Sequence, residues 1–284
     1  MEAGGLDSSG RQFSSAREMW REEIGAGEGE DNAAADNGKR REWYRKGIAY
    51  WQGVDASMDG VLGGYGCVNE ADVKGSEAFL KTLFLERFGN AKRHLVALDC
   101  GSGIGRVTKN LLLRYFNEVD LVEPVSHFLE AARENLAPGM DVQEETHRAA
   151  NFYCVPLQEF TPEDGRYDVI WIQWCIGQLP DDDFISFFKR AKVGLKPNGF
   201  FVVKENTARG GFVLDKDDQS ITRSDSYFKE LFNQCGLHIY STKDQKGLPK
   251  ELFPVKMYAL VTDKAKGGSI GKIRRKNYCP AIIQ

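Results

Sequence analysis

The feature that most constrains the fold is a regular alternation of two kinds of segment along the chain. Short runs of β-branched and aliphatic residues, bounded by Gly, Asp and Pro, are each followed by a longer stretch in which apolar residues recur at helical spacing. This alternation predicts an α/β fold built on a mostly parallel sheet. The predicted strands span residues 94–100, 119–123, 151–155, 168–174, 200–205, 236–241 and 255–262. The predicted helices span residues 75–88, 105–115, 126–135, 181–195 and 224–235.

The connection between the last two predicted strands is short and carries no helical pattern. A connection between parallel strands usually contains a helix. We therefore expect these two strands to form an antiparallel hairpin at one edge of the sheet.

The two ends of the chain differ from the middle in composition. Residues 22–38 hold six acidic residues and no Lys or Arg, interleaved with Gly, Ala and Asn, which predicts a disordered linker. We expect residues 1–41 to form a largely disordered extension, and residues 42–263 to form the folded domain with the aromatic segment Trp43–Trp51 docked on it as a cap. Residues 264–284 contain six basic and no acidic residues and are expected to form a flexible tail. Such tails are usually solvated, and nuclear targeting or electrostatic docking is the alternative.

Charge and composition exclude several classes of partner. Lys and Arg total 38 against 41 Asp and Glu, so the net charge of -3 provides no overall attraction to nucleic acid or acidic membranes. No apolar run approaches the roughly 20 residues of a membrane-spanning helix. The acidic first 30 residues are the reverse of a secretory signal. We expect the protein in the cytoplasm and nucleus.

The cysteines give no sign of a metal site. The six of them form no Cys-x-x-Cys pair and have no metal-ligand spacing with the four histidines. We interpret them as reduced packing residues and predict no bound metal. A catalytic cysteine is the less favoured alternative, which stays open because Cys and His partners meet in space rather than in sequence.

A glycine-rich loop marks the expected ligand site. The first predicted strand runs to Asp99, and Gly101, Gly103 and Gly105 follow immediately before a helical pattern. Glycines here allow positive φ angles and let a ligand approach the N–H groups at the start of the helix. A dinucleotide fingerprint requires Gly or Ala where Arg106 stands, so NAD is not favoured.

The Gly-x-Gly-x-Gly spacing after an acidic residue instead resembles the nucleotide loop of class I S-adenosylmethionine-dependent methyltransferases. Glu123 ends the next predicted strand and is placed to accept hydrogen bonds from both ribose hydroxyls of such a cofactor. An antiparallel last strand is also typical of that fold.

Residues at the ends of two later strands would face the substrate. Trp174 is either a simple core residue or an indole wall that holds a charged amine by cation–π attraction. The run from Asp215 to Asp218 follows the strand that ends near Asn206. Clustered carboxylates are usually solvated, but their position after this strand favours a catalytic role. The Cys-Ile-Gly after Trp174 lacks the Asn-Pro-Pro-Tyr-like loop of nucleic-acid methyltransferases, so we expect no direct nucleic-acid binding.

Several longer strings carry a closer resemblance. They are Val61-Leu-Gly-Gly-Tyr-Gly66, Leu98-Asp-Cys-Gly-Ser-Gly-Ile-Gly-Arg106, Tyr167-Asp-Val-Ile-Trp-Ile-Gln-Trp174, and Lys204-Glu-Asn206 with Leu214-Asp215. Over about residues 43–262 the chain resembles the alpha N-terminal protein methyltransferases. The resemblance implies a Rossmann-like class I methyltransferase sheet of seven strands, mostly parallel with the last strand antiparallel, and an N-terminal helical extension. It also implies methyl transfer from S-adenosylmethionine to the α-amine of proteins that begin Xaa-Pro-Lys after removal of the initiator Met.

The resemblance also implies roles for individual residues. The implied cofactor contacts are Gly101, Arg106, Glu123, Pro124, Val125, Leu157, Gln158 and Gln173. The implied peptide channel consists of Trp51, Leu62, Gly63, Trp174, Gln178, Asn206, Asp215 and Asp218. The catalytic residues would be Asn206, which anchors the substrate, and Asp218, which contacts the reacting amine and helps to deprotonate it. Asp215 would pair with the substrate Lys.

Two positions depart from the family pattern. Gln178 stands where better-known members have His, and Phe253 stands where they have Tyr. If that His is the general base, this chain must use Asp218 or water, and Phe253 cannot supply the hydrogen bond of the Tyr hydroxyl.

Two alternatives in function stay open at this point. The chain could methylate another amine, on a small molecule or a lysine side chain, or it could be a non-catalytic binder of basic N-terminal tails. An α-amine, with a pKa near 7.7–8.0, needs less help from a base than a lysine amine with a pKa near 10.4. This difference favours the N-terminal substrate.

Overall fold

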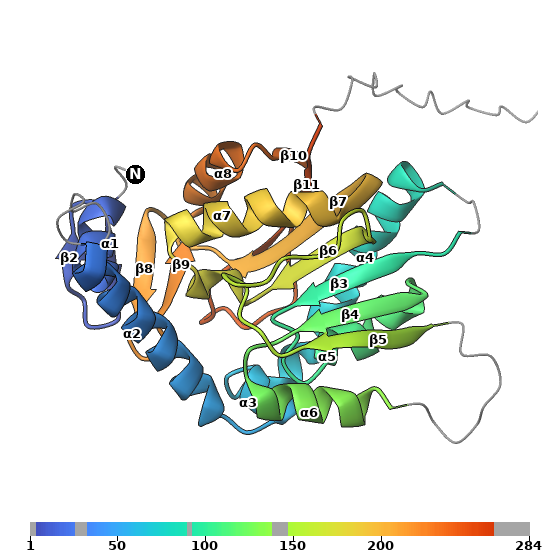
Figure 1. Cartoon of the computed structure of the whole chain (residues 1–284), viewed down its shortest axis with the longest axis horizontal. Coiled ribbons are helices and arrows are strands. Elements are labelled where there is room, and N and C mark those ends of the chain that lie inside the picture. The colour runs from blue at the N-terminus through green and yellow to red at the C-terminus, as the bar shows by residue number, and fades with distance from the viewer. Residues whose placement is uncertain (1–3, 26–32, 90–92, 138–146, 264–284) are drawn as a thin grey trace, which may run out of the picture.

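The computed structural model describes residues 4–25, 33–89, 93–137 and 147–263. A sheet with the strand order β10-β11-β7-β6-β3-β4-β5 forms its centre (Figure 1). Its strands are β3 (Val96–Cys100), β4 (Glu118–Val122), β5 (Arg148–Tyr153), β6 (Tyr167–Gln173), β7 (Leu195–Asn206), β10 (His238–Asp244) and β11 (Val255–Val261). Strands β3 to β7 run parallel, whereas β11 is antiparallel to both β7 and β10. The predicted α/β fold and the antiparallel hairpin at its edge are therefore confirmed.

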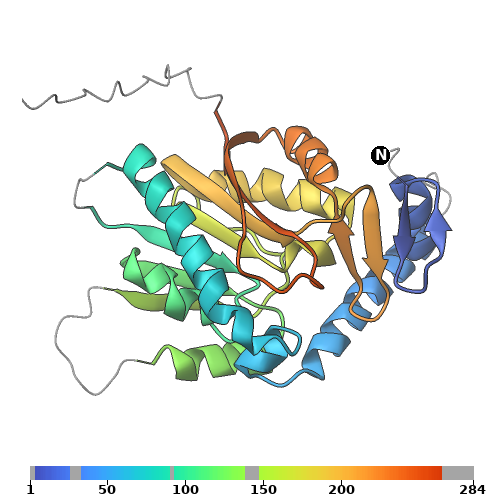
Figure 2. The same ribbon diagram turned by 180° about the vertical axis from the view of Figure 1, so that it is seen from behind.

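Helices cover both faces of this sheet because its central strands are apolar on both sides. Every residue of β6 is buried. Ile170 and Ile172 pack into one apolar layer, and Val169 and Trp171 pack into the other. Helices α7 and α8 cover the first face, and α4, α5 and α6 cover the second (Figures 1 and 2). Their bounds are α4 (Asn69–Arg87), α5 (Arg106–Asn110), α6 (Ser126–Asn135), α7 (Asp181–Ala191) and α8 (Asp225–Gln234).

The ends of several elements differ from the prediction. Helix α6 has the predicted bounds, but α4 begins at Asn69 instead of residue 75. Helices α5 and α7 end early and pass into the short 3-10 helices η3 (Leu112–Arg114) and η5 (Lys192–Gly194). The early start of α4 matters for the site, because it includes the buried side chain of Asp72.

A second, smaller sheet was not predicted. Its strands are β1 (Gly5–Asp7), β2 (Gln12–Phe13), β8 (Phe212–Asp215) and β9 (Ser220–Arg223), in the order β2-β1-β8-β9. Strand β1 pairs parallel to β8, with Leu6 opposite Val213 and Asp7 opposite Leu214. The N-terminal residues therefore lie against the strand that leads into the acidic run 215–218 (Figure 1).

The prediction for the N-terminal region is wrong over the described residues. Residues 4–25 form β1, β2 and helix α1 (Ala16–Ile24), and the side chains of Phe13, Met19, Trp20 and Ile24 are buried. Acidic residues hid this amphipathic pattern, because Met19, Trp20 and Ile24 share one face of the helix while Glu18 and Glu22 lie elsewhere on its surface.

The predicted linker also differs from the structure. Helix α2 (Ala33–Gln52) includes the end of that stretch as well as the aromatic segment. Trp43 of α2 is buried in the same apolar cluster as side chains of α7 and α8, and it meets the ring of Trp20 edge-on at 5.3 Å between centroids. Residues 26–32 and the predicted basic tail 264–284 lie outside the described residues.

Candidate active site

Two adjoining pockets open at the carboxyl ends of the parallel strands, the edge of an α/β sheet where ligands bind. The first pocket lies beyond β3, β4 and β6, and the second extends from the end of β6 to the end of β7 and to the loop before β11. Their empty volumes, measured out to the open mouths, are ≈ 1100 Å³ and ≈ 1200 Å³. Both pockets are lined by Trp51, Val61, Trp174, Cys175 and Gln178. The two pockets therefore share a wall.

The structure brings nearly all of the predicted site residues to these pockets. Every residue implied as a cofactor contact lines the first pocket. Those implied for the peptide channel line the second pocket, except Asp215. Asp215 lies at the end of β8, near enough to Asp218 for its charge to affect the pKa of that carboxyl. The roles of these residues stay predictions.

The glycine loop has the geometry that its sequence predicts. Gly101, Gly103 and Gly105 have φ angles of 63°, 53° and 75°, which other residues rarely adopt. A Cβ atom on Gly101 would lie 2.3 Å from Cβ of Cys175, so a side chain there would clash with the shared wall.

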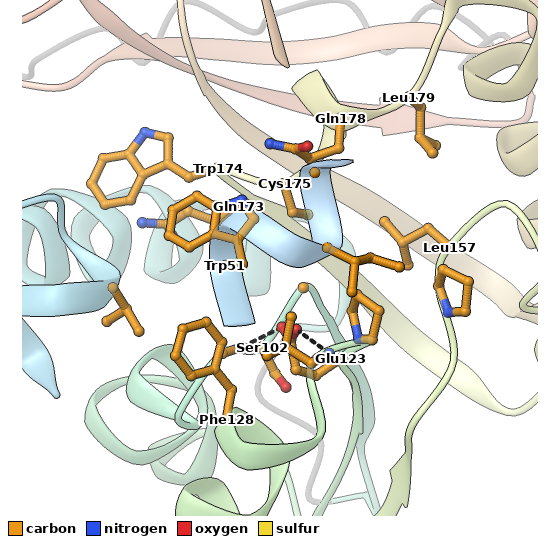
Figure 3. Close-up of a pocket in the computed structure, with 18 of the residues that line it drawn as sticks. Trp51, Ser102, Glu123, Phe128, Leu157, Gln173, Trp174, Cys175, Gln178 and Leu179 are labelled. Carbon is orange, nitrogen blue, oxygen red and sulfur yellow. Dashed lines mark hydrogen bonds between the residues drawn. The ribbon is translucent and has the colours of Figure 1, made fainter. Parts of the chain in front are cut away.

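Glu123 is the buried carboxylate of the first pocket. Its oxygens accept hydrogen bonds from the backbone N–H groups of Gly103 and Val125, each at 2.9 Å (Figure 3). Burial raises the pKa of Glu123 to about 7, although both N–H groups oppose this shift. A carboxylate can accept about four hydrogen bonds, so Glu123 has capacity left for hydroxyl groups of a ligand.

Three buried polar atoms of the pocket lining have no hydrogen-bond partner among the described residues. They are Ser102 Oγ, Trp174 Nε1 and Asp218 Oδ1. Buried polar groups in proteins are nearly always paired, so unpaired ones in a pocket indicate where a ligand binds. Ser102 lines the first pocket, Asp218 lines the second, and Trp174 lines both. Sequence reasoning missed Ser102, although it lies inside the glycine loop.

Trp174 forms a strained part of the shared wall. Its φ angle is 53°, an unusual value for a bulky residue. The guanidinium of Arg106 lies 5.5 Å from the centroid of its ring. Such left-handed positions cluster at functional sites, where the surrounding structure holds them.

Helix α2 covers the first pocket with aromatic side chains. Trp43, Tyr44, Ile48 and Trp51 all line it, and Trp43 Nε1 donates a hydrogen bond to the carbonyl of Gln178 at 2.9 Å. Figure 3 shows Trp51, Phe128, Leu157 and Glu123 arranged around one space. Sequence reasoning identified Trp51 but not its neighbours on α2, although aromatic and apolar residues at positions 43, 44, 48 and 51 gave the signal.

A buried charged network centred on Asp72 supports the first pocket. Its carboxylate, 1% exposed, contacts Arg106 Nη1 at 2.7 Å and Lys204 Nζ at 2.5 Å. Gln173 Nε2 donates to both of its oxygens, at 2.9 Å and 3.0 Å. Burial alone would raise the pKa of Asp72, but the two cations outweigh burial and lower it. Asp72 thereby fixes Arg106 and Gln173, the residues implied for the methionine end of the cofactor.

Replacing Asp72 with Asn is expected to lower the free energy of unfolding by about 1.5–3 kcal/mol, the value of a hydrogen bond to a charged group, since Arg106 and Lys204 lose their shared anion. Urea unfolding should show a lower midpoint with an unchanged slope. Glu70→Gln is the matched control, because Glu70 lies exposed in the first turn of the same helix, and its change should stay within about 0.5 kcal/mol. Equal urea midpoints for the two variants would contradict the claim that Asp72 stabilises the fold through its pairs with Arg106 and Lys204.

The turn between β8 and β9 carries Asp218 into the second pocket. Burial raises the pKa of Asp218 to about 6, with hydrogen bonds from Ser220 opposing and the charge of Asp215 adding to the shift. In the amide orientation that satisfies both side-chain atoms, Gln178 Nε2 donates to the carbonyls of Asp218 at 2.9 Å and Gln219 at 3.1 Å. Gln178 therefore holds the backbone of this turn.

Within the described ranges, no group of three or more His, Cys, Asp or Glu side chains is arranged to hold a metal ion. No helix in those ranges is long and apolar enough to cross a membrane. Cys175 lies in the shared wall, but burial raises the pKa of its thiol well above the usual range. A thiol held in the protonated form is a poor nucleophile, which disfavours a catalytic role for Cys175.

Comparison with known proteins agrees with this geometry. The family model described as AdoMet dependent proline di-methyltransferase matches residues 39–261. Alpha N-terminal protein methyltransferase 1 of Arabidopsis thaliana is 68% identical over 287 residues and covers 100% of both chains. N-terminal Xaa-Pro-Lys N-methyltransferase 1 of Mus musculus is 41% identical over 220 residues, which cover 78% of this chain and 96% of that protein. A solved structure of a SAM-dependent methyltransferase from Leishmania major has 38% identity and a TM-score of 0.78, over 92% of this chain and 97% of that one.

Proposed function

Because this chain belongs to the family of AdoMet-dependent proline di-methyltransferases, we propose that it transfers methyl groups from S-adenosylmethionine to the α-amine of proteins that begin Xaa-Pro-Lys after removal of the initiator Met. The observation that carries the proposal is the shared wall of Trp51 and Trp174. On one side of this wall lies a pocket with a glycine loop and a buried carboxylate, and on the other lies a pocket with Asn206 and Asp218. Relatives that are 41% identical are named for Xaa-Pro-Lys N-termini, which supports the same substrate here.

The residues of the first pocket fit S-adenosylmethionine. Glu123 would accept hydrogen bonds from the ribose hydroxyls, and Pro124, Val125, Leu157 and Gln158 would surround the adenine. Arg106 and Gln173 would bind the methionine end, and the free hydroxyl of Ser102 would contact the same cofactor. When bound, S-adenosylmethionine supplies a methyl group on a positively charged sulfur.

Asp218 would remove the proton that keeps the substrate amine from reacting. Its Oδ1 accepts no hydrogen bond from the described residues, and its pKa of about 6 keeps it ionised at neutral pH. Moving a proton from an α-amine with a pKa of 7.7–8.0 to this carboxylate costs about 2–3 kcal/mol. The same transfer from a lysine amine with a pKa of 10.4 costs about 6 kcal/mol. This difference supports an N-terminal rather than a lysine substrate.

Asn206 and Gln178 would have supporting roles. Asn206 ends β7 in the second pocket and would anchor the N-terminal residues of the substrate by hydrogen bonds. Gln178 carries an amide, which takes up no proton at neutral pH and so cannot act as the base. Its hydrogen bonds to the turn support a role in positioning Asp218.

Mass spectrometry of a synthetic Ser-Pro-Lys-Arg peptide incubated with the protein and S-adenosylmethionine tests the proposal. We expect methyl mass to be gained on this peptide and not on the same peptide acetylated at its α-amine. A peptide with Gln in place of Pro should react much more slowly if the channel depends on the proline ring.

The other outcomes identify the alternatives. Methylation of both the free and the acetylated peptide would indicate a lysine side chain as the acceptor. Tight cofactor binding without reaction on any of these peptides would indicate another amine substrate. Peptide binding without cofactor binding would indicate a non-catalytic binder of basic N-terminal tails.

We also propose that the protein acts on proteins rather than nucleic acids and is located in the cytoplasm and nucleus. The net charge of -3 supports the first statement, and the basic run in residues 264–284 supports a nuclear location.

A further inference from the structure

The turn that carries Asp218 contains a cation that could compete with the substrate. It reads Asp215-Lys216-Asp217-Asp218, so one lysine lies among three carboxylates. The expected substrate is itself cationic, with an α-ammonium group and a lysine at position three. A lysine ammonium on its flexible four-carbon stem is able to pair with a nearby carboxylate and to neutralise the charge that would attract the peptide.

In the structure, Lys216 turns away from the pocket and binds the N-terminal extension, by which we mean residues 4–25. Its Nζ lies 3.1 Å from Asp7 Oδ2 and 3.5 Å from Glu23 Oε1. The interaction with Asp7 is the largest cause of a raised pKa for Lys216, so the ammonium is charged across the physiological range. Asp218, two residues later, lines the second pocket.

Asp7 is built into the extension to accept this lysine. Its side chain is 1% exposed, and its Oδ1 accepts hydrogen bonds from Ser9 N at 3.0 Å, Ser9 Oγ at 2.6 Å and Arg11 N at 3.0 Å. These bonds, the one from the Ser9 hydroxyl most of all, lower the pKa of Asp7 to about 2. The other oxygen, Oδ2, is left to face Lys216.

The backbone fixes the two partners relative to each other. Strand β1 pairs with β8 so that Asp7 is opposite Leu214, and Ser8 N donates to the carbonyl of Leu214 at 2.8 Å. Residues 4–25 lie before the start of the family match at residue 39. The extension is therefore an addition to the part of the chain that the family model matches. It contacts the turn of residues 215–218 directly, through Lys216.

We propose that Asp7 and Glu23 are positioning residues that hold Lys216 away from Asp215 and Asp218, so that these carboxylates stay free for a cationic peptide N-terminus. This inference rests on the proposed function. It assigns to the N-terminal extension a role in substrate affinity rather than in cofactor binding or chemistry.

Steady-state kinetics with the Ser-Pro-Lys-Arg peptide test it. Asp7→Asn combined with Glu23→Gln should raise the peptide KM about two- to tenfold, the range expected of partly exposed ion pairs, with little change in kcat and in the Kd of S-adenosylmethionine. Adding Lys216→Ala should return KM to the value of the unmodified protein, because it removes the competing cation. A merely structural role for Asp7 predicts no such rescue.

Two controls keep the result interpretable. Glu22→Gln changes the neighbouring acid of α1, which pairs with Arg11 and not with Lys216, and should leave KM unchanged. If the double variant fails to fold, Glu23→Gln alone should still raise KM by a smaller factor, again reversed by Lys216→Ala.

An unchanged KM in the Asp7 and Glu23 variants, or a raised KM that Lys216→Ala does not reverse, would overturn the inference. If the unmodified protein methylates no peptide, the proposed function fails, and the same variants test the inference through the Kd of the peptide.

Discussion

Replacing Asp218 with Asn is expected to lower kcat on the Ser-Pro-Lys-Arg peptide by about 10²–10⁴-fold, the usual contribution of a general base. Asn has nearly the same shape but cannot take up a proton. The first pocket does not include Asp218, so the Kd of S-adenosylmethionine should stay unchanged. Kinetics on the peptide and calorimetric titration of the cofactor measure these two quantities separately.

The pH dependence gives this prediction a direction. The pKa of Asp218 is raised to about 6, so its basic form disappears as the pH falls through 6. We therefore expect kcat/KM of the unmodified protein to fall about tenfold per pH unit below this value. This fall in kcat/KM at acidic pH should be absent in the Asn variant, which has no group at this position that titrates.

Asp217→Asn is the matched control, because Asp217 lies exposed in the same turn and does not line the second pocket. It removes one negative charge that acts on Asp218, so KM for the cationic peptide should rise slightly while kcat is kept. Equal losses of kcat in the two variants would contradict a specific role for Asp218 as the base, because Asp217 does not line the second pocket. If kcat/KM of Asp218→Asn still falls below pH 6 as it does in the unmodified protein, the base is another group or water.

The main sheet could be predicted because hydrophobic periodicity is a local property of the chain. Strand β6 and helix α6 lie within one residue of their predicted bounds, since continuous apolar runs and i, i+3, i+4 spacing are decided by burial on the sheet faces. The second sheet could not be found in this way. Strand β1 has three residues and pairs with β8, more than 200 positions later, and no local pattern encodes such a pairing.

The site shows the same division between local motifs and tertiary contacts. The glycine loop and Glu123 were predicted because a strand, a turn and a helix start follow one another in sequence. Asp72 was missed because its role depends on ion pairs with Arg106 and Lys204, which lie on α5 and β7 and are distant from it in sequence. From sequence, a lone Asp near the start of a helix is interpreted as an ordinary surface residue. Only its burial among cations, which the structure shows, distinguishes Asp72.

Replacing Glu123 with Ala is expected to raise the Kd of S-adenosylmethionine by about 10²–10⁴-fold. The variant loses two hydrogen bonds from ribose hydroxyls to a charged acceptor, each worth about 1.5–3 kcal/mol, and every 1.4 kcal/mol is a factor of ten in Kd. It also releases the N–H groups of Gly103 and Val125, which Glu123 holds at 2.9 Å. Calorimetric titration with S-adenosylmethionine, or with S-adenosylhomocysteine where the affinity is low, measures the loss.

The pH dependence of cofactor binding separates the charge of Glu123 from its shape. Burial raises the pKa of Glu123 to about 7, and the protonated form has lost one acceptor oxygen, so the cofactor affinity of the unmodified protein should weaken as the pH falls below 7. Glu123→Gln should bind weakly at every pH and lose this dependence. Glu118→Gln at the other end of β4 is the control, because Glu118 pairs with Arg148 and Arg166 and does not line the first pocket. Equal and pH-independent affinities in the unmodified protein and in Glu123→Gln would mean that the ribose is bound by other groups, and Ser102 would be the next residue to replace.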